Sequence, residues 1–156
     1  MENLQLVLPE IFLSLSIMFL LIFGVFKKNS SRLVQSLSLA VLIVTAVITF
    51  NETIGINETK LFNNSIIIDY LSSLMKIITL LAAFLVLIIS SNYLKTFKIF
   101  KIEYPILILS SVLGMMVMIN SNDLIVFYMG LELQSLALYV LATFNRDQIK
   151  SSEAGL

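Results

Sequence analysis

The sequence contains no cysteine and no histidine among its 156 residues. The lack of cysteine excludes disulfides and iron–sulfur clusters ligated by this chain. The lack of histidine removes the commonest protein ligand of haem and transition metals. No Gly-x-Gly-x-x-Gly or Walker pattern is present either, so the chain offers no nucleotide-binding motif. We therefore expect a chain that carries no electrons and holds no cofactor or metal of its own.

Charged residues are also scarce. They make up 13% of the chain, whereas 58% of the residues are hydrophobic and the mean hydropathy is +0.98. That is too little charge for the surface of a soluble domain of this size. The net charge is zero, so nothing in the composition indicates a nucleic-acid partner. The composition instead predicts a protein whose main surroundings are a lipid bilayer.

The hydrophobic residues fall into five runs, each long enough to cross a bilayer or nearly so. We predict helices over about 7–26, 33–50, 70–93, 104–119 and 124–144. Pro9 and Pro105 stand in first turns, where a missing N–H costs little. Asp69 and Asp123 precede helices and are predicted to cap them. The predicted fold is thus an all-α membrane protein with a single transmembrane domain over residues 1–156.

Basic residues alternate along the chain in a way that orients these helices. Lys60 lies on one side of the predicted bundle, and Lys76 lies inside a span. The other eight basic residues share the opposite side: Lys27, Lys28, Arg32, Lys95, Lys98, Lys101, Arg146 and Lys150. Because basic loops remain in the cytoplasm or matrix, we predict an N-terminus outside and a C-terminus inside.

Glu132 is the most informative single residue. It lies near the middle of Leu124–Phe144, which holds no other charge. A carboxylate at that depth costs about 2.5–3.5 kcal/mol on insertion scales. Two interpretations are open: a proton carrier that faces protein or a wet cavity, and an interhelical ion pair or hydrogen bond that only joins helices. The intramembrane position favours the first.

Other polar residues could act with Glu132. Tyr128, Ser135 and Tyr139 share its helical stripe at spacings of four, three and seven residues. Gly130 could allow close approach of a second helix. Lys76 lies about one and a half turns into its helix, so it could reach the membrane interface or supply a cation to Glu132. The sequence leaves both possibilities open.

The segment around Glu132 resembles a known family. Asn122–Tyr139, read with Arg146 and Lys150–Leu156, is similar to chain N of respiratory complex I, the counterpart of mitochondrial NADH dehydrogenase subunit 2. Upstream, Leu8–Ile11 and Asp69–Ile77 resemble the entries to the first and third helices of that family. The resemblance covers the whole chain, and only the Glu132 segment is sharply specific.

The resemblance implies an antiporter-like subunit of the proton-pumping membrane arm, active as an NADH:ubiquinone reductase only within the complex. It implies that Glu132 pairs with a lysine on a later helix, which this chain does not contain. Family members have many more helices, so we expect a truncated sequence or one half of a split subunit. The expected partners are other membrane-arm subunits, a chain carrying the remaining helices, and the lipid bilayer.

Two alternatives remain beside this interpretation. One is a subunit of a related cation/proton antiporter, and the other is a small structural subunit of a membrane complex. A free-standing enzyme is disfavoured, since the chain shows no nucleophile–base pair or metal-ligand set. The expected location is the mitochondrial inner membrane or a bacterial plasma membrane.

Overall fold

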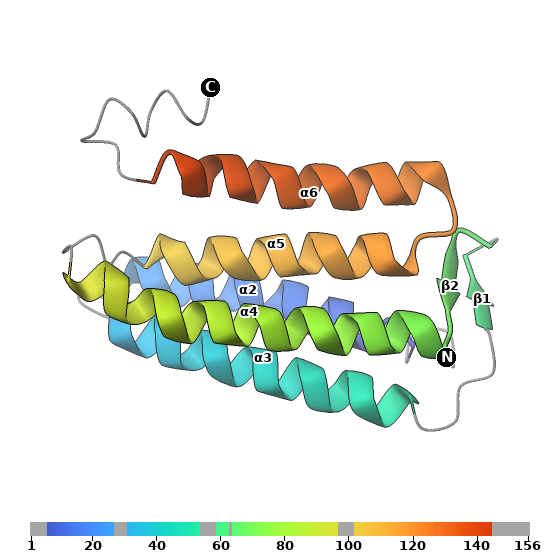
Figure 1. Ribbon diagram of the computed structural model, residues 1–156, viewed down its shortest axis with the longest axis horizontal. Helices are drawn as coiled ribbons and strands as arrows, with labels where there is room; N and C mark the ends of the chain where they lie inside the picture. Colours follow the sequence, from blue (N-terminus) through green and yellow to red (C-terminus); the bar gives the residue numbers. More distant parts are fainter. Residues whose placement is uncertain (1–5, 27–30, 54–58, 63, 97–101, 145–156) are drawn as a thin grey trace.

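A computed structural model describes residues 6–26, 31–53, 59–62, 64–96 and 102–144. Within these ranges the chain forms five long helices and one small hairpin of two strands. The helices are α2 (Leu8–Phe26), α3 (Ser31–Thr53), α4 (Tyr70–Thr96), α5 (Glu103–Asn120) and α6 (Leu124–Ala142). They run side by side along the long axis of the molecule (Figure 1). All five are long and apolar enough to cross a membrane, which confirms the predicted fold class.

The helix boundaries differ from the predicted ones by up to three residues. The largest differences are at α3, which begins at Ser31 and ends at Thr53, and at α4, which ends at Thr96. A search for apolar runs stops at the first polar residues. Backbone hydrogen bonds continue through polar residues, however, so α3, α4 and α5 extend past the apolar segments, whereas α6 ends two residues before its predicted end.

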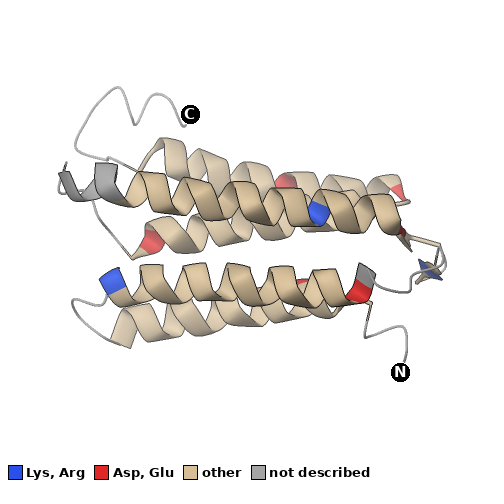
Figure 2. Ribbon diagram, turned by 60° about the horizontal axis from the view of Figure 1, so that its bottom comes forward, with Lys and Arg blue, Asp and Glu red and all other residues tan. Residues whose placement is uncertain are grey.

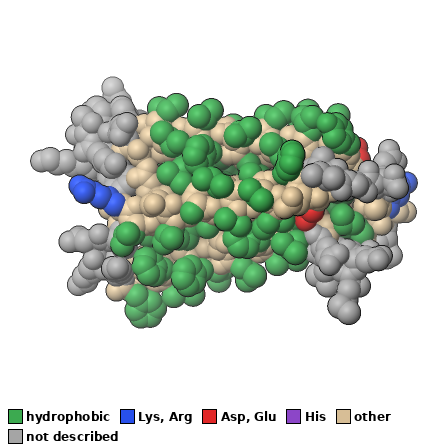
Figure 3. Space-filling view, turned by 90° about the horizontal axis from the view of Figure 1, so that it is seen from below, with side chains coloured by type: hydrophobic (Ala, Val, Ile, Leu, Met, Phe, Trp, Pro, Cys, Tyr) green, Lys and Arg blue, Asp and Glu red, His purple; other side chains and the backbone are tan. Residues whose placement is uncertain are grey.

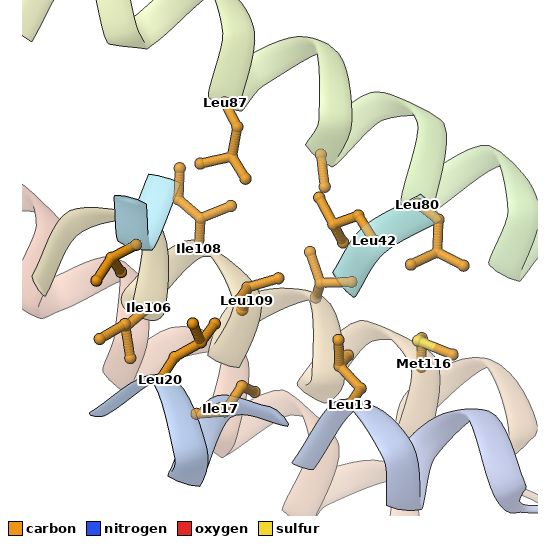
Figure 4. Packing of buried hydrophobic residues seen from close by; sticks show 13 residues of the cluster. Leu13, Ile17, Leu20, Leu42, Leu80, Leu87, Ile106, Ile108, Leu109 and Met116 are labelled. Atoms are coloured by element: carbon orange, nitrogen blue, oxygen red, sulfur yellow. The ribbon is translucent and has the colours of Figure 1, made fainter. Parts of the chain in front are cut away.

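The core lies where α2, α3, α4 and α5 meet. Its fully buried members include Leu13, Leu42, Leu80 and Leu109, one from each of these helices (Figure 4). α6 packs on the far side of α5 and stands apart from the other helices (Figure 1). It therefore contributes little to this core.

Large apolar side chains also cover the outside of the bundle. Figure 3 shows them spread over the face seen from below. On α2, for example, Leu15 and Phe19 are 65% and 63% exposed. A soluble monomer rarely exposes so continuous an apolar surface, and a bilayer accommodates it.

The hairpin consists of β1 (Thr59–Leu61) and β2 (Ile66–Ile68), which pair antiparallel. It lies across the end of the bundle where α5 leads into α6 (Figure 1). Ile66 forms an isolated bridge with Ser121, and the Asn122 amide donates to the Ser65 carbonyl at 2.9 Å. The sequence predicts only a polar connection here. The hairpin thus ties that connection to the α5–α6 turn.

The predicted N-cap residues lie at the starts of α4 and α6. The Asp69 carboxylate accepts from the Ser72 amide at 2.7 Å, and the Ser72 hydroxyl accepts in turn from the Asp69 amide at 2.9 Å. Asp123 caps α6 by accepting from the Ile125 amide at 3.4 Å. Both predicted N-caps are therefore confirmed, and both fix the entry of a helix at the hairpin end of the bundle.

Charges lie mainly near the two ends of the bundle, and few interrupt its length (Figure 2). Arg32 is exposed at the start of α3, and Lys60 is exposed on the hairpin at the opposite end. Most residues behind the predicted orientation lie outside the described part of the chain or have side chains that it does not describe: Lys27, Lys28, Lys95, Lys98, Lys101, Arg146 and Lys150. The orientation stays a prediction.

Candidate functional site

Glu132 lies in the middle of α6 and is half-buried. The Tyr128 hydroxyl, one turn earlier, hydrogen-bonds to its carboxyl group. The Ser135 hydroxyl donates to the backbone carbonyl of Glu132 at 3.1 Å, not to its side chain. Tyr139 is 58% exposed. Of the three predicted neighbours, Tyr128 is the one whose side chain hydrogen-bonds to the carboxyl group.

The face of α6 that carries these groups is largely uncovered. Gly130 and Ala137 are the buried residues of this helix, and Tyr128 is 59% exposed. Within the described ranges, no lysine or arginine forms an ion pair with Glu132. The carboxyl group therefore faces a side of the bundle where a further helix could pack, with Tyr128 as its described side-chain partner.

Two glycines set the distance between α5 and α6. A Cβ atom on Gly114 would lie 2.7 Å from both the Gln134 nitrogen and the Gly130 oxygen. A Cβ atom on Gly130 would lie 2.9 Å from the Gly114 oxygen. Both obstacles are backbone atoms, so neither can yield easily. This confirms the close approach predicted at Gly130, and it holds Glu132 at a fixed position against α5.

Lys76 is buried in a different place. It is 1% exposed and forms an ion pair with Glu10, with 2.6 Å between Nζ and Oε1. The side chain therefore does not reach the membrane interface. In the described structure it pairs with a carboxylate of α2, not with Glu132 of α6.

Asn120 completes this second polar cluster. Its Nδ2 donates to Oε1 of Glu10 at 2.8 Å, so three helices meet at one carboxylate: α2, α4 and α5. Two buried atoms of the cluster, Oε2 of Glu10 and Oδ1 of Asn120, have no hydrogen-bond partner in the described part of the chain. We call Glu10, Lys76 and Asn120 the hairpin-end cluster.

The sequence by itself points to no site role for Glu10 or Asn120. The sequence nevertheless contains a signal for the Glu10–Lys76 pairing, because these two residues each lie within two turns of a helix start. Both helices start on the same predicted side of the membrane, so opposite charges at matching depth could have been paired. Among the described residues, no group of three or more His, Cys, Asp or Glu side chains could hold a metal ion.

Similarity to known proteins extends over the whole chain. A relative from Pelagibacter ubique (strain HTCC1062), named NADH-quinone oxidoreductase subunit N, is 64% identical over 156 residues. The chain is similar to NADH-quinone oxidoreductase subunit N. The match covers 100% of this chain and 33% of that relative. The family resemblance found in the sequence is thereby confirmed.

Other relatives of the same name agree. Subunit N from Maricaulis maris (strain MCS10) is 44% identical over 157 residues, covering 99% of this chain and 32% of the relative. Subunit N from Bartonella bacilliformis (strain ATCC 35685 / KC583 / Herrer 020/F12,63) is 46% identical over 155 residues, covering 99% and 31%. The chain spans about one third of the length of these relatives.

The family described as NADH:quinone oxidoreductase/Mrp antiporter, TM matches residues 121–156. This range includes all of α6 and therefore Glu132. The three relatives named above are bacterial, and they give no support to a mitochondrial location. Together with the five apolar helices, the similarity to subunit N identifies a multi-pass membrane protein.

Proposed function

We propose that this chain is part of the proton-translocating membrane arm of an NADH-quinone oxidoreductase. In this proposal Glu132 is a protonatable relay residue, and the chain carries no redox centre. The observation that carries the proposal is the similarity to subunit N over the full chain, with Glu132 inside the matched α6 segment. The enzymatic activity belongs to the complex, to which this chain contributes a proton path.

The geometry of α6 supports a relay. Glu132 lies eight residues after Leu124, the first residue of the helix, which is about 12 Å along its axis at 1.5 Å per residue. An ionised carboxyl at that depth accepts a hydrogen bond from Tyr128, and a protonated one can donate to a neighbour. Its open face can receive a partner helix. We infer that this partner supplies a cation, because an unpaired charge in a bilayer is costly.

The same proposal assigns partners and orientation. The remaining helices of subunit N, on this polypeptide or on another, would cover the open face of α6. Other membrane-arm subunits would flank them. The hairpin end of the bundle would face the outside, and the end with Arg32 would face the cytoplasm of a bacterial cell.

The decisive experiment replaces Glu132 in the assembled complex. Glu132→Gln keeps the shape of the side chain but cannot release a proton, so assembly should be normal while NADH-driven proton pumping falls at least tenfold. Glu132→Asp keeps the acid and should be milder. Pumping is measured by the acidification of vesicles, and assembly by native gel electrophoresis.

Glu103→Gln is the matched control, because Glu103 is an exposed carboxylate at the opposite end of α5 from the hairpin. It should pump as the wild type does. If Glu132 is only a structural hydrogen-bonding group, Gln is tolerated and Asp is harmful. Wild-type pumping by an assembled Glu132→Gln complex would defeat the relay proposal.

A second candidate is a subunit of a cation/proton antiporter without NADH-oxidising partners. The description of the matching family, which names both systems, favours keeping this candidate. The two differ in associated subunits. Affinity isolation of the tagged chain from native membranes should recover flavin- and iron–sulfur-containing subunits if the complex is an NADH-quinone oxidoreductase, and none if it is an antiporter.

A further inference from the structure

The hairpin-end cluster is separate from Glu132 and has chemistry of its own. Glu10 lies in the first turn of α2, Lys76 in the second turn of α4, and Asn120 at the last residue of α5. These three helix ends meet beside the hairpin (Figure 1). Glu132 belongs to α6, on the far side of α5.

Burial makes this cluster unusual. Glu10, Lys76 and Asn120 are 7%, 1% and 3% exposed. Removing an ion pair from water carries a desolvation penalty that the mutual attraction often fails to offset. Apolar side chains of similar volume could join the same helices as well or better. The ion pair is therefore weak evidence for a purely structural role.

A second carboxyl group lies close by. Glu52, near the end of α3, is half-buried and lies within electrostatic range of both Lys76 and Glu10. The ammonium group of Lys76 thus forms its ion pair with Glu10 and also lies within electrostatic range of Glu52. With all three ionised the net charge is −1, and one bound proton makes it zero. A poorly hydrated site favours the neutral form.

The unpartnered atoms show where that proton can lie. The amide of Asn120 already donates to one oxygen of the Glu10 carboxyl. The other carboxyl oxygen and the amide oxygen are both buried acceptors without a described partner. A proton on Oε2 of Glu10 turns one of these acceptors into a donor, which suits the carbonyl of a neighbouring primary amide. Lys76 is then balanced by Glu52.

We propose that Glu10, Glu52, Lys76 and Asn120 form a second proton-binding site, which holds one proton that passes between Glu10 and Glu52. In one state Glu10 is protonated and Glu52 balances Lys76. In the other, Glu52 is protonated and Glu10 forms the ion pair that the structure shows. One O–H bond breaks and another forms, and the net charge of the site does not change.

The position of Glu52 connects the proposed proton-binding site to the aqueous phase. Glu10 is buried, whereas Glu52 is half-exposed at the hairpin end, so the proton can exchange there with the aqueous phase. Other ionisable groups described near this end are occupied or exposed. Asp69 and Asp123 cap helices, and Lys60 is exposed on the hairpin. The inference goes beyond the proposed function, since it requires no role for Glu132.

Infrared spectroscopy of the native assembly, isolated through a tag on this chain, tests the proposal at neutral pH. Glu52→Gln leaves the Glu10–Lys76 ion pair intact, so the assembly should form normally. Its spectrum should lack one protonated-carboxyl band that the wild type shows. Glu10→Gln should lose one such band as well, because Glu52 then ionises to balance Lys76. Lys76→Met should gain one band, since both carboxyl groups then take up protons.

Glu103→Gln is again the control, and it should leave the protonated-carboxyl region unchanged. An unchanged region in Glu52→Gln would overturn the proposal, because the carboxyl would then be ionised in the wild type. A band lost in Glu52→Gln but retained in Glu10→Gln would also overturn it, since Glu52 would then keep its proton and could not balance Lys76. Glu132 is present in every variant, so a failure of this proposal is distinguishable from a failure of the relay.

Discussion

At the scale of single residues, the hydrogen bond from Tyr128 to Glu132 is the contact that bears most directly on the proposed relay. Tyr128→Phe removes this donor and leaves the acid in place. We expect normal assembly and a pumping rate between those of the wild type and Glu132→Gln, measured in the same vesicles.

Tyr139→Phe is the matched control for Tyr128→Phe. Tyr139 is almost equally exposed on the same helix, and the described hydrogen bonds use its backbone carbonyl alone. Its loss of a hydroxyl should leave pumping unchanged. Equal effects of the two substitutions would show that the Tyr128 hydroxyl does not act through Glu132.

The sequence could place a residue within its helix where that residue stands out against its own surroundings, whereas the role of Glu132 as a proton carrier stays a prediction. Glu132 is a lone charge in an apolar run, so its position within the bundle could be read directly. Glu10 and Asn120 stand near helix ends, where polar residues are ordinary. Their contact joins positions separated by 110 residues, and no local pattern encodes it. Lys76 was identified, but its partner depends on which helices are neighbours.

At the scale of elements, the two glycines between α5 and α6 govern how Glu132 is held. Gly114→Ala places a Cβ atom against backbone atoms of α6, so the helices must separate. Such overpacking costs about 1–3 kcal/mol. We expect the assembled complex to unfold at a lower temperature and to pump more slowly, as followed by thermal denaturation and vesicle acidification.

Gly24→Ala is a control in which the added Cβ atom meets a side chain and not the backbone. A Cβ atom there would lie 2.6 Å from Cγ2 of Ile102, a side-chain atom that can move by changing its rotamer. The loss of thermal stability should therefore be smaller than for Gly114→Ala. A larger loss at Gly24 would mean that the α5–α6 approach is not the limiting contact.

The elements themselves were mostly predictable, because a span in a bilayer needs an apolar run of fixed length. The N-caps at Asp69 and Asp123 followed from local chemistry as well. The hairpin could not be predicted, because its strands have three residues each and are stabilised by contacts with the distant α5–α6 turn. Nothing in the sequence around Ile66 or Ser121 indicates the bridge that joins them.

At the scale of the whole molecule, the orientation in the membrane is open to a simple test. The chain has no cysteine, so single cysteines report position without a background. One placed at Asn64, exposed in the hairpin loop, should react with an impermeant reagent from outside. One at Ser30, just before α3, should react only after the membrane is opened. Labelling of both from the same side would refute the proposed arrangement of the helices.

The open face of α6 makes a prediction about the chain expressed by itself. Glu132 and Tyr128 would then face lipid, where an uncovered carboxylate costs about 2.5–3.5 kcal/mol or more. We expect aggregation or degradation, measured as a low monodisperse fraction by size-exclusion chromatography in detergent. Glu132→Leu removes this penalty and should raise that fraction, whereas Gln134→Leu, which removes a neutral amide from the same helix, should raise it less. A wild-type chain that remains monodisperse and monomeric alone would show that the α6 face needs no covering helix, and the proposed partner of Glu132 would lose its physical basis.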